Sequence, residues 1–541
     1  MSQEPTNQYN AIVIGGGHNG LVAAGYLAKK GARTVVLEAR HKTGGAADTM
    51  SPWEEAPDIK VTTLSYVMSL MPPTIQRDLE LERFGYKIHP QGMGYLPHPN
   101  GASIVQHEDE AKTHASIARF SKKDADAYPA FEEWIGRVAN IMGPLLMETP
   151  PNLGSKKPKD IKDVAQLGWS LRNEIDAKTV ADITRLFTMS ATDLLDRWFE
   201  SPVFKGFMAV NGIIGTWAGP DAPGTAYVLM HHSVGDIGDG QIASWGYPEG
   251  GMGAVSRACE DAARYFGAEI RTNARVKKIL VRNGRAEGVV LEDGTELSAP
   301  IVVTAVHPKI TFLEQIERGD LPEEFVQDIE HWKTRSGTVK INLAVAELPE
   351  FTADPGFDPQ IHGGAIQILD DVDYLERAFQ EARFGKAATT PFSDTAIPTV
   401  FDKTLAPEGI HVVSMFTQWV PQEWADEDGH EKDLEQYADR LIERVNEVAP
   451  NFKGSILHRQ IIGPKQMQDE WGLIGGNIFH GELTVDQLFH MRPAPGYADY
   501  RTPISGLYQA SSATHAGGGV TGMPGHHCVR EILRDKGAKT I

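Results

Sequence analysis

Residues 10–20 read NAIVIGGGHNG, and this stretch decides the fold. Its first half is a short β-branched run suited to a buried strand, and its second half carries a Gly-x-Gly-x-x-Gly motif. Apolar residues then recur at helical spacing over residues 21–30, and a second apolar run at 34–37 ends on Glu38. The order strand, glycine turn, helix, strand, acid predicts one Rossmann-like βαβ unit.

The residues of this motif have separate tasks in a dinucleotide site. Gly15 permits the tight turn, Gly17 lets the backbone approach a pyrophosphate, and Gly20 lets the helix pack on its strand. The N-terminus of the helix offers free N–H groups to phosphates. Glu38 accepts hydrogen bonds from ribose hydroxyls and repels a 2′-phosphate, so we expect a bound dinucleotide other than NADP.

Two further glycine clusters extend this prediction. Gly44-Gly45 follows the ribose acid closely and would let the backbone approach the pyrophosphate again, although a surface turn is the alternative. Near the far end, a strand at 506–510 is followed by GGGVTG at 517–522 and by a helix from about residue 525 to 535. No returning strand and ribose acid follow, so we expect this cluster to place a helix N-terminus against the first site. A purely structural glycine loop is the alternative.

Composition excludes several classes of protein. The 541 residues include 52 Lys or Arg and 72 Asp or Glu, and the net charge of −20 argues against a non-specific nucleic-acid binder. Cys259 and Cys528 are the only cysteines, which excludes a disulfide framework and a CxxC pair. Adjacent histidines at 231–232 and 526–527 lack ligand partners at suitable spacing, so no metal site is predicted. With no signal-like segment at 1–10 and no apolar run long enough to cross a membrane, we expect a cytoplasmic protein.

Segments along the whole chain resemble the phytoene-dehydrogenase-related flavoproteins. They include residues 274–279, which look like the strand that touches the adenine, and 299–305, which look like the strand returning to the first sheet. GGNIFHGE at 475–482 and DQLFHMRP at 486–493 resemble the branch named pyridine nucleotide-disulphide oxidoreductase domain-containing protein 2. The resemblance implies FAD as the cofactor.

The resemblance also implies an α/β fold, with a Rossmann-like FAD-binding domain assembled from separated segments and an inserted α+β substrate domain. We expect the FAD-binding domain at residues 1–107, 240–310 and 460–541, and the substrate or cap domain at 108–239 and 311–459. The Gly-Gly-Arg usual in flavin amine oxidases is Gly44-Gly45-Ala46 here, so Arg40 is the expected source of positive charge. The predicted FAD contacts are Gly15, Gly17, His18, Asn19, Gly20, Glu38, Ala39, Arg40, Gly44, Gly45, Ala46, Val276, Gly518, Gly519, Val520 and Thr521.

Two residues are candidates for catalysis. Lys340 lies in a strand-like run at 336–343 and resembles, by context, the lysine that holds a water at the flavin N5 of amine oxidases. The alternative is a solvated lysine on an edge strand. His515 precedes the last glycine cluster and could face the flavin ring, but a hydrogen-bonded structural histidine is the competing interpretation.

We therefore expect an FAD-dependent oxidoreductase that transfers hydride to or from a small hydrophobic, unsaturated substrate. Desaturation, saturation and double-bond isomerisation all fit, and a second nicotinamide domain is not expected. The alternatives are a flavin amine oxidase and an FAD-stabilised interaction protein with little turnover. Apolar residues spaced along one helical face at 131–145 fit either a cap core or an entry for a lipid-like substrate, with peripheral membrane contact. The oligomeric state is not predicted.

Overall fold

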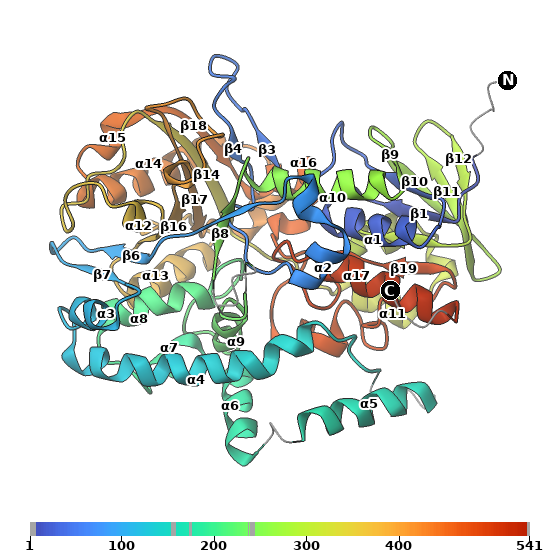
Figure 1. The fold of residues 1–541 in the computed structure, drawn as a ribbon, viewed down its shortest axis with the longest axis horizontal. Helices are drawn as coiled ribbons and strands as arrows, with labels where there is room; N and C mark the ends of the chain where they lie inside the picture. The colour runs from blue at the N-terminus through green and yellow to red at the C-terminus, as the bar shows by residue number, and fades with distance from the viewer. Residues whose placement is uncertain (1–6, 153–157, 173–175, 236, 238–243, 538–541) are drawn as a thin grey trace.

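The computed structural model describes residues 7–152, 158–172, 176–235, 237 and 244–537. Two large sheets form two lobes, and the chain passes between them several times (Figure 1). Segments from the start, the middle and the end of the chain build the first lobe, whereas the second lobe is built mainly from the middle. The fold is α/β and contains a Rossmann-like domain assembled from separated segments, as predicted.

The first lobe contains a five-stranded parallel sheet in the order β19-β13-β1-β2-β9. The predicted βαβ unit is confirmed, because its first strand and helix are followed by a strand parallel to the first. The strand predicted to return to the first sheet, β13, pairs in parallel with β1, and β19 adds the end of the chain. The elements are β1 (Ala11–Ile14), α1 (His18–Lys29), β2 (Thr34–Leu37), β9 (Glu269–Arg271), β13 (Val302–Thr304) and β19 (Leu507–Gln509).

Alternate residues of these strands face two different cores. On one face, Val13 and Val303 pack with α1, α10 (Met252–Tyr265) and α17 (Met523–Asp535). On the other face, Ile12 and Val302 pack with the antiparallel sheet of β10 (Val276–Arg282), β11 (Arg285–Leu291) and β12 (Glu296–Ser298), and with α11 (Glu323–Glu330). A parallel sheet buried on both faces explains the continuous apolar runs in its strands.

Helix α17 packs directly on α1, although the two are separated by nearly the whole chain. Gly525 makes this approach possible, because a Cβ atom there would lie 2.2 Å from the carbonyl oxygen of Asn19. The Asn19 side chain also donates from Nδ2 to Ser512 Oγ at 3.1 Å. The two ends of the chain are thus held together at the N-terminal end of α1.

The second lobe contains a seven-stranded mixed sheet in the order β18-β14-β17-β16-β15-β6-β7. Its strands are β18 (Ile456–Ile462), β14 (Thr338–Val345), β17 (His411–Gln418), β16 (Phe392–Ala396), β15 (Ala365–Ile368), β6 (Gly94–Pro97) and β7 (Ser103–Val105). The last two strands correct one expectation, because the sequence placed residues 1–107 with the nucleotide-binding domain. In the structure β6 pairs with β15, about 270 residues away along the chain, and so belongs to the second sheet. The other domain boundaries remain a prediction.

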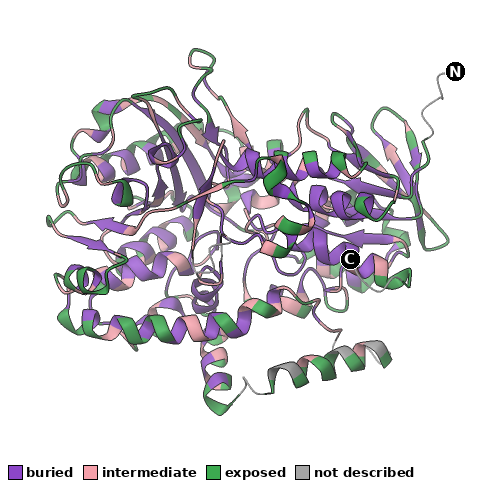
Figure 2. Ribbon diagram, viewed as in Figure 1, coloured by how far each residue is buried: buried purple, intermediate pink, exposed green. Residues whose placement is uncertain are grey.

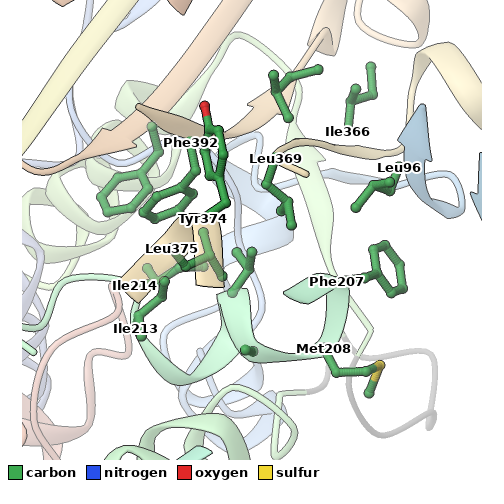
Figure 3. Packing of buried hydrophobic residues seen from close by; sticks show 14 of the residues in the cluster. Leu96, Phe207, Met208, Ile213, Ile214, Ile366, Leu369, Tyr374, Leu375 and Phe392 are labelled. Carbon is green, nitrogen blue, oxygen red and sulfur yellow. The ribbon is translucent and has the colours of Figure 1, made fainter. Parts of the chain in front are cut away.

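Helices from the segment between residues 110 and 231 form a cap beside the seven-stranded sheet (Figure 1). Phe207 and Met208 of α8 belong to one continuous hydrophobic core with Leu96 of β6, Ile366 of β15 and Tyr374 of α13 (Val372–Arg383) (Figure 3). The cap helices are α3 (Glu110–Ile117), α4 (Lys122–Leu146), α5 (Pro158–Leu171), α6 (Ala177–Thr188), α7 (Ala191–Leu195), α8 (Pro202–Ala209) and α9 (Thr225–His231).

Helix α5 lies at the periphery, and most of its described side chains are exposed (Figure 2). None of the helices in the described part of the chain is both long enough and apolar enough to cross a membrane. The remaining elements are β3 (Thr49–Met50), β4 (Val61–Thr62), α2 (Pro73–Asp78), β5 (Ile88–Pro90), β8 (Gly246–Pro248), α12 (Pro359–His362), α13 (Val372–Arg383), α14 (Glu431–Val448), α15 (Phe452–Ser455) and α16 (Pro464–Trp471).

The contact between the chain ends can be tested with Gly525→Ala. The added methyl group overlaps the Asn19 carbonyl and must push α17 away from α1, which we expect to cost about 1–3 kcal/mol of stability. The melting temperature of the FAD-loaded protein should fall accordingly. Gly319→Ala is the control, because a Cβ there meets no atom within 4 Å. Equal melting temperatures for the two variants would contradict the packing described here.

Candidate cofactor and substrate site

A cavity of about 1150 Å³ lies between the two sheets. The carboxyl ends of β1, β2 and β13 open onto it from one side, and residues of β14, β15 and β16 line it from the other. Side chains of α4 and α9 extend the lining into the cap. The volume exceeds the range of about 300–1000 Å³ that is usual for a single small ligand, so a dinucleotide and a substrate have room together.

The glycine turn after β1 has the geometry that the sequence predicts. Gly15 has φ +98°, which favours glycine, and a Cβ at Gly20 would lie 2.1 Å from the Gly15 carbonyl oxygen. Gly17 precedes α1 and differs from both, because a Cβ there would meet nothing within 4 Å. The open space beside Gly17 belongs to the cavity, where a pyrophosphate can approach the start of the helix.

The second glycine pair packs on the first turn. Gly44 donates its N–H to the Gly16 carbonyl at 2.9 Å, and a Cβ at Gly45 would lie 3.3 Å from the Cα atom of Gly17. This contact excludes the alternative of an isolated surface turn. Two stretches of bare backbone therefore lie side by side at one edge of the cavity.

The acid at the end of β2 organises the same edge. Glu38 accepts hydrogen bonds from the backbone N–H groups of Gly16 at 2.7 Å and Arg40 at 2.8 Å. The Arg40 guanidinium is paired with Asp48 at 3.4 Å and lies over the Trp471 ring. A carboxylate and a partly screened cation thus face the part of the cavity where a ribose and a pyrophosphate would lie.

Several buried polar atoms at this edge have no hydrogen-bond partner among the residues that the structure describes. They are His18 Nε2, Asn19 Oδ1 and Arg40 Nη1, and all three residues line the cavity. Buried polar groups without a partner are uncommon in native proteins, because each costs desolvation free energy. A ligand with acceptor and donor groups, such as a dinucleotide, fits these atoms.

Most predicted contact residues line the cavity, and four do not. Gly518 is one of these four. The Phe479 ring fills the space beside it, because a Cβ at Gly518 would lie 2.4 Å from that ring. The residues at the cavity are Gly15, Gly17, His18, Asn19, Glu38, Ala39, Arg40, Gly45, Ala46, Val276, Gly519 and Val520, and those behind it are Gly20, Gly44, Gly518 and Thr521. Their role in binding FAD remains a prediction.

His515 is not among the cavity residues. Its ring is buried, and Nε2 is hydrogen-bonded to the Leu145 carbonyl at 3.1 Å. Burial lowers the pKa of the imidazole to about 4, so it is neutral at pH 7. The expectation of a catalytic residue facing the ring is therefore corrected in favour of a structural histidine.

Lys340 lines the cavity and is almost fully buried, with 1% of its surface exposed. Strand β14 lies between β17 and β18, so the alternative of a solvated lysine on an edge strand is wrong. Nζ donates to Asn342 Oδ1 at 2.7 Å and to Ser414 Oγ. Burial lowers the pKa of the amine to about 7, so charged and neutral forms coexist near neutral pH.

Two further titratable groups lie beside Lys340. The Tyr66 hydroxyl donates to Asp394 Oδ2 at 2.5 Å, and the Tyr66 ring lies 5.6 Å from Lys340 Nζ. Burial raises the pKa of Asp394 to about 6, although the Tyr66 hydrogen bond and the charge of Lys340 both act in the opposite direction. All three residues line the cavity, which therefore contains groups able to gain or lose a proton near pH 7.

Comparison with known proteins gives two family matches. Residues 13–80 match the NAD(P)-binding Rossmann-like domain. Residues 187–525, more than half of the chain, match the flavin containing amine oxidoreductases. The chain belongs to this family. With the dinucleotide-binding turn already described, membership identifies FAD as the cofactor.

Relatives align with this flavin containing oxidoreductase over nearly its whole length. Pyridine nucleotide-disulfide oxidoreductase domain-containing protein 2 of Rattus norvegicus is 38% identical, over 98% of this chain and 94% of that protein. A limonene dehydrogenase subunit of Castellaniella defragrans is 24% identical, over 98% and 95%. Prolycopene isomerase 1, chloroplastic, of an Oncidium hybrid cultivar is 26% identical, over 99% and 85%.

Solved structures share the fold. Cyclohexylamine oxidase from Brevibacterium oxydans superposes with a TM-score of 0.59 at 16% identity, over 98% of this chain and 99% of that one. The family resemblance and the branch that the sequence indicated are both confirmed by these matches together.

Sequence reasoning missed several polar residues of the cavity. His307 and His480 have rings 5.5 Å apart, and each has a buried ring nitrogen for which the described residues offer no partner. Burial lowers their pKa values, so both are neutral at pH 7. Tyr66 and Asp394 were also missed. Asp394 stands between buried neighbours in a strand, and this is the one local signal that could have identified it.

The open space at Gly17 gives a direct test of the cofactor site. Gly17→Val adds a side chain that meets only the cavity, so we expect a folded protein that loses FAD. Absorbance near the flavin bands, relative to protein absorbance, measures the loading after purification. Gly454→Val is the control, because it also meets nothing within 4 Å but lies on the surface. A fully loaded Gly17→Val protein would overturn the assignment of this turn.

The low pKa of Lys340 predicts a pH dependence of stability. The folded-state pKa of about 7 lies below the ordinary value of 10.5, so the unfolded chain binds more protons between these pH values. The destabilisation that comes from burying the Lys340 amine is therefore absent above pH 10.5, grows as pH falls from 10.5 to 7, and is complete below pH 7. Between pH 7 and 9.5, the wild type should gain on Lys340→Met by up to about 1.4 kcal/mol per pH unit.

Denaturant titration of both proteins at several pH values measures this gain. Exposed Lys432→Met is the control and should remain parallel to the wild type. A constant difference between wild type and Lys340→Met across the range would contradict the depressed pKa.

Proposed function

We propose that this protein transfers hydride between FAD and a hydrophobic, unsaturated substrate. The observation that carries the proposal is the continuity of the cavity. It runs from the glycine turns past Lys340 into the cap, where Met208, Ile214 and Leu229 contribute apolar side chains to its lining. Such a cavity suits a carbon skeleton that extends away from the cofactor.

The names of two relatives support the substrate class. One is a limonene dehydrogenase subunit and the other a prolycopene isomerase, and both names refer to unsaturated hydrocarbons. Desaturation, saturation and double-bond isomerisation therefore remain the three forms of the proposal. The rat relative is the most similar of the three, and its name does not mention a substrate.

FAD, when bound, supplies the acceptor or donor of hydride, and the chain supplies the surroundings. The buried wall formed by the seven-stranded sheet keeps water from the reacting carbon atoms. Lys340 and Asp394, with pKa values of about 7 and about 6, can hold or take up the proton that accompanies hydride removal from a C–H bond.

A flavin amine oxidase is the second candidate, and one observation favours it. Tyr66 and Phe416 both line the cavity and are stacked, with ring centroids 5.9 Å apart and an angle of 18° between planes. Paired aromatic rings next to a carboxylate suit a cationic amine. The two candidates differ in what they oxidise, so one experiment separates them.

Anaerobic mixing of the FAD-loaded protein with a substrate panel tests the proposal. Unsaturated terpenoid alcohols should bleach the oxidised flavin absorbance, and saturated primary amines of similar size should not. Bleaching by the amines alone would replace the proposal with the second candidate. Two results together would contradict both candidates. In the first, no compound of the panel changes the spectrum of the oxidised flavin. In the second, no compound of the unsaturated product class reoxidises flavin that has been reduced with dithionite.

A further inference from the structure

Four residues form one row across the seven-stranded sheet. Lys340 pairs with Phe416 between β14 and β17, Phe416 pairs with Asp394 between β17 and β16, and Asp394 pairs with Gln367 between β16 and β15. Residues directly opposite one another in antiparallel strands point to the same face. That face is the cavity wall, because all four residues line the cavity.

Tyr66 lies over the middle of this row. Its ring stacks on Phe416, and its hydroxyl donates to one oxygen of Asp394. In the described part of the chain, no other group bonds to the Asp394 carboxylate. Its second oxygen is therefore left to accept a hydrogen bond from a molecule in the cavity.

Gln367 adds a second acceptor beside Asp394. Only 6% of its surface is exposed, and Oε1 is buried with no partner in the described part of the chain. Lys340, at the other end of the row, donates to Asn342 and Ser414 within the sheet. The row therefore presents to the cavity two acceptor oxygens, one from Asp394 and one from Gln367, that have no partner among the described residues.

A pure hydrocarbon would leave these acceptors buried and unpaired, which costs about 1–3 kcal/mol for each neutral group and more for a charged one. A substrate with a hydroxyl or amine group would satisfy them. The apolar side chains of the cap lie along another part of the same cavity. The cavity thus combines an acceptor site on the sheet with apolar side chains from the cap, among them Met208, Ile214 and Leu229.

We propose that Asp394 and Gln367 bind a hydrogen-bond donor group on the substrate, which is therefore an unsaturated hydrophobic alcohol or amine rather than a hydrocarbon. This inference rests on the proposed function, since it names the substrate class of the same site. Asp394 and Gln367 are the residues that set this specificity. Tyr66 orients the Asp394 carboxylate, and the cap receives the carbon chain.

Equilibrium binding of matched probes tests the inference without turnover. Farnesol, farnesyl methyl ether and farnesylamine share one carbon chain, and only the ether lacks a donor. Titration into the FAD-loaded full chain is followed by the change in the flavin absorption spectrum. We expect farnesol to bind at least about tenfold more tightly than the ether, because the ether leaves the acceptors unpaired.

Substitutions at the two acceptors identify the residues responsible. In Asp394→Asn, Tyr66 can bond the amide oxygen, which leaves an amide donor facing the substrate donor. Farnesol affinity should fall to that of the ether, and farnesylamine affinity should fall further if it binds as a cation. Gln367→Leu should weaken farnesol and leave the ether unchanged. Asp428→Asn, at an exposed ion pair with Lys465, is the matched control and should alter neither probe.

The outcomes separate this inference from the proposed function. Equal affinity for farnesol and the ether, no spectral change with farnesol, or wild-type affinity in both acceptor variants would overturn the inference. If Asp394→Asn fails to hold FAD, Gln367→Leu still gives the comparison. Failure of the proposed function appears instead as an absence of anaerobic flavin bleaching, whichever probe binds. A preference for farnesylamine over farnesol identifies the amine as the donor, and the reverse identifies the alcohol.

Discussion

The contact between α17 and α1 is the constraint on which the rest of the site depends. Gly525 lies against the carbonyl oxygen of Asn19, so close that no side chain fits between the two helices. The bond from Asn19 Nδ2 to Ser512 Oγ fixes the loop before α17 to the same point. Because Asn19 belongs to the first glycine turn, residues near 519 are brought to the cavity beside residues near 17.

The parallel sheet places the residues that this contact brings together at a ligand-binding edge. The carboxyl ends of parallel strands meet at one edge of a sheet, which is where α/β proteins bind ligands. Here β1, β2 and β13 end at the cavity with a glycine turn, an acid and a buried histidine respectively. The opposite wall is a different sheet, in which Lys340, Asp394 and Gln367 lie in one row with Phe416. Cofactor chemistry and substrate selection are therefore assigned to two separate walls of one cavity.

Local signals made the first wall predictable. The βαβ unit, the roles of Gly15, Gly17 and Gly20, and the position of the last glycine cluster beside the first turn were predicted from short-range patterns. The return of β13 to the first sheet was predicted from the resemblance. Gly518 does not line the cavity because the Phe479 side chain fills the space beside it.

The second wall could not be predicted in the same way. Strand β6 contains Gly94 and Pro97, which weaken any strand pattern, and its partner β15 lies far along the chain. Likewise Tyr66 and Asp394 are 328 residues apart along the chain. They meet only because the loop that contains Tyr66 lies against the neighbouring strands β16 and β17. Without a fixed spacing, no motif connects them. The pairing of strands, not the sequence of any one segment, creates this part of the site.

The central claim is that both ends of the chain form a single FAD site facing the polar row of the second sheet. A crystal structure of the FAD-loaded protein measures this most directly. We predict that the pyrophosphate lies against Gly17 and Gly45, with the flavin ring between Gly519 and Lys340. A cofactor that makes no contact after residue 460, or a ring that points away from Lys340, would contradict the account.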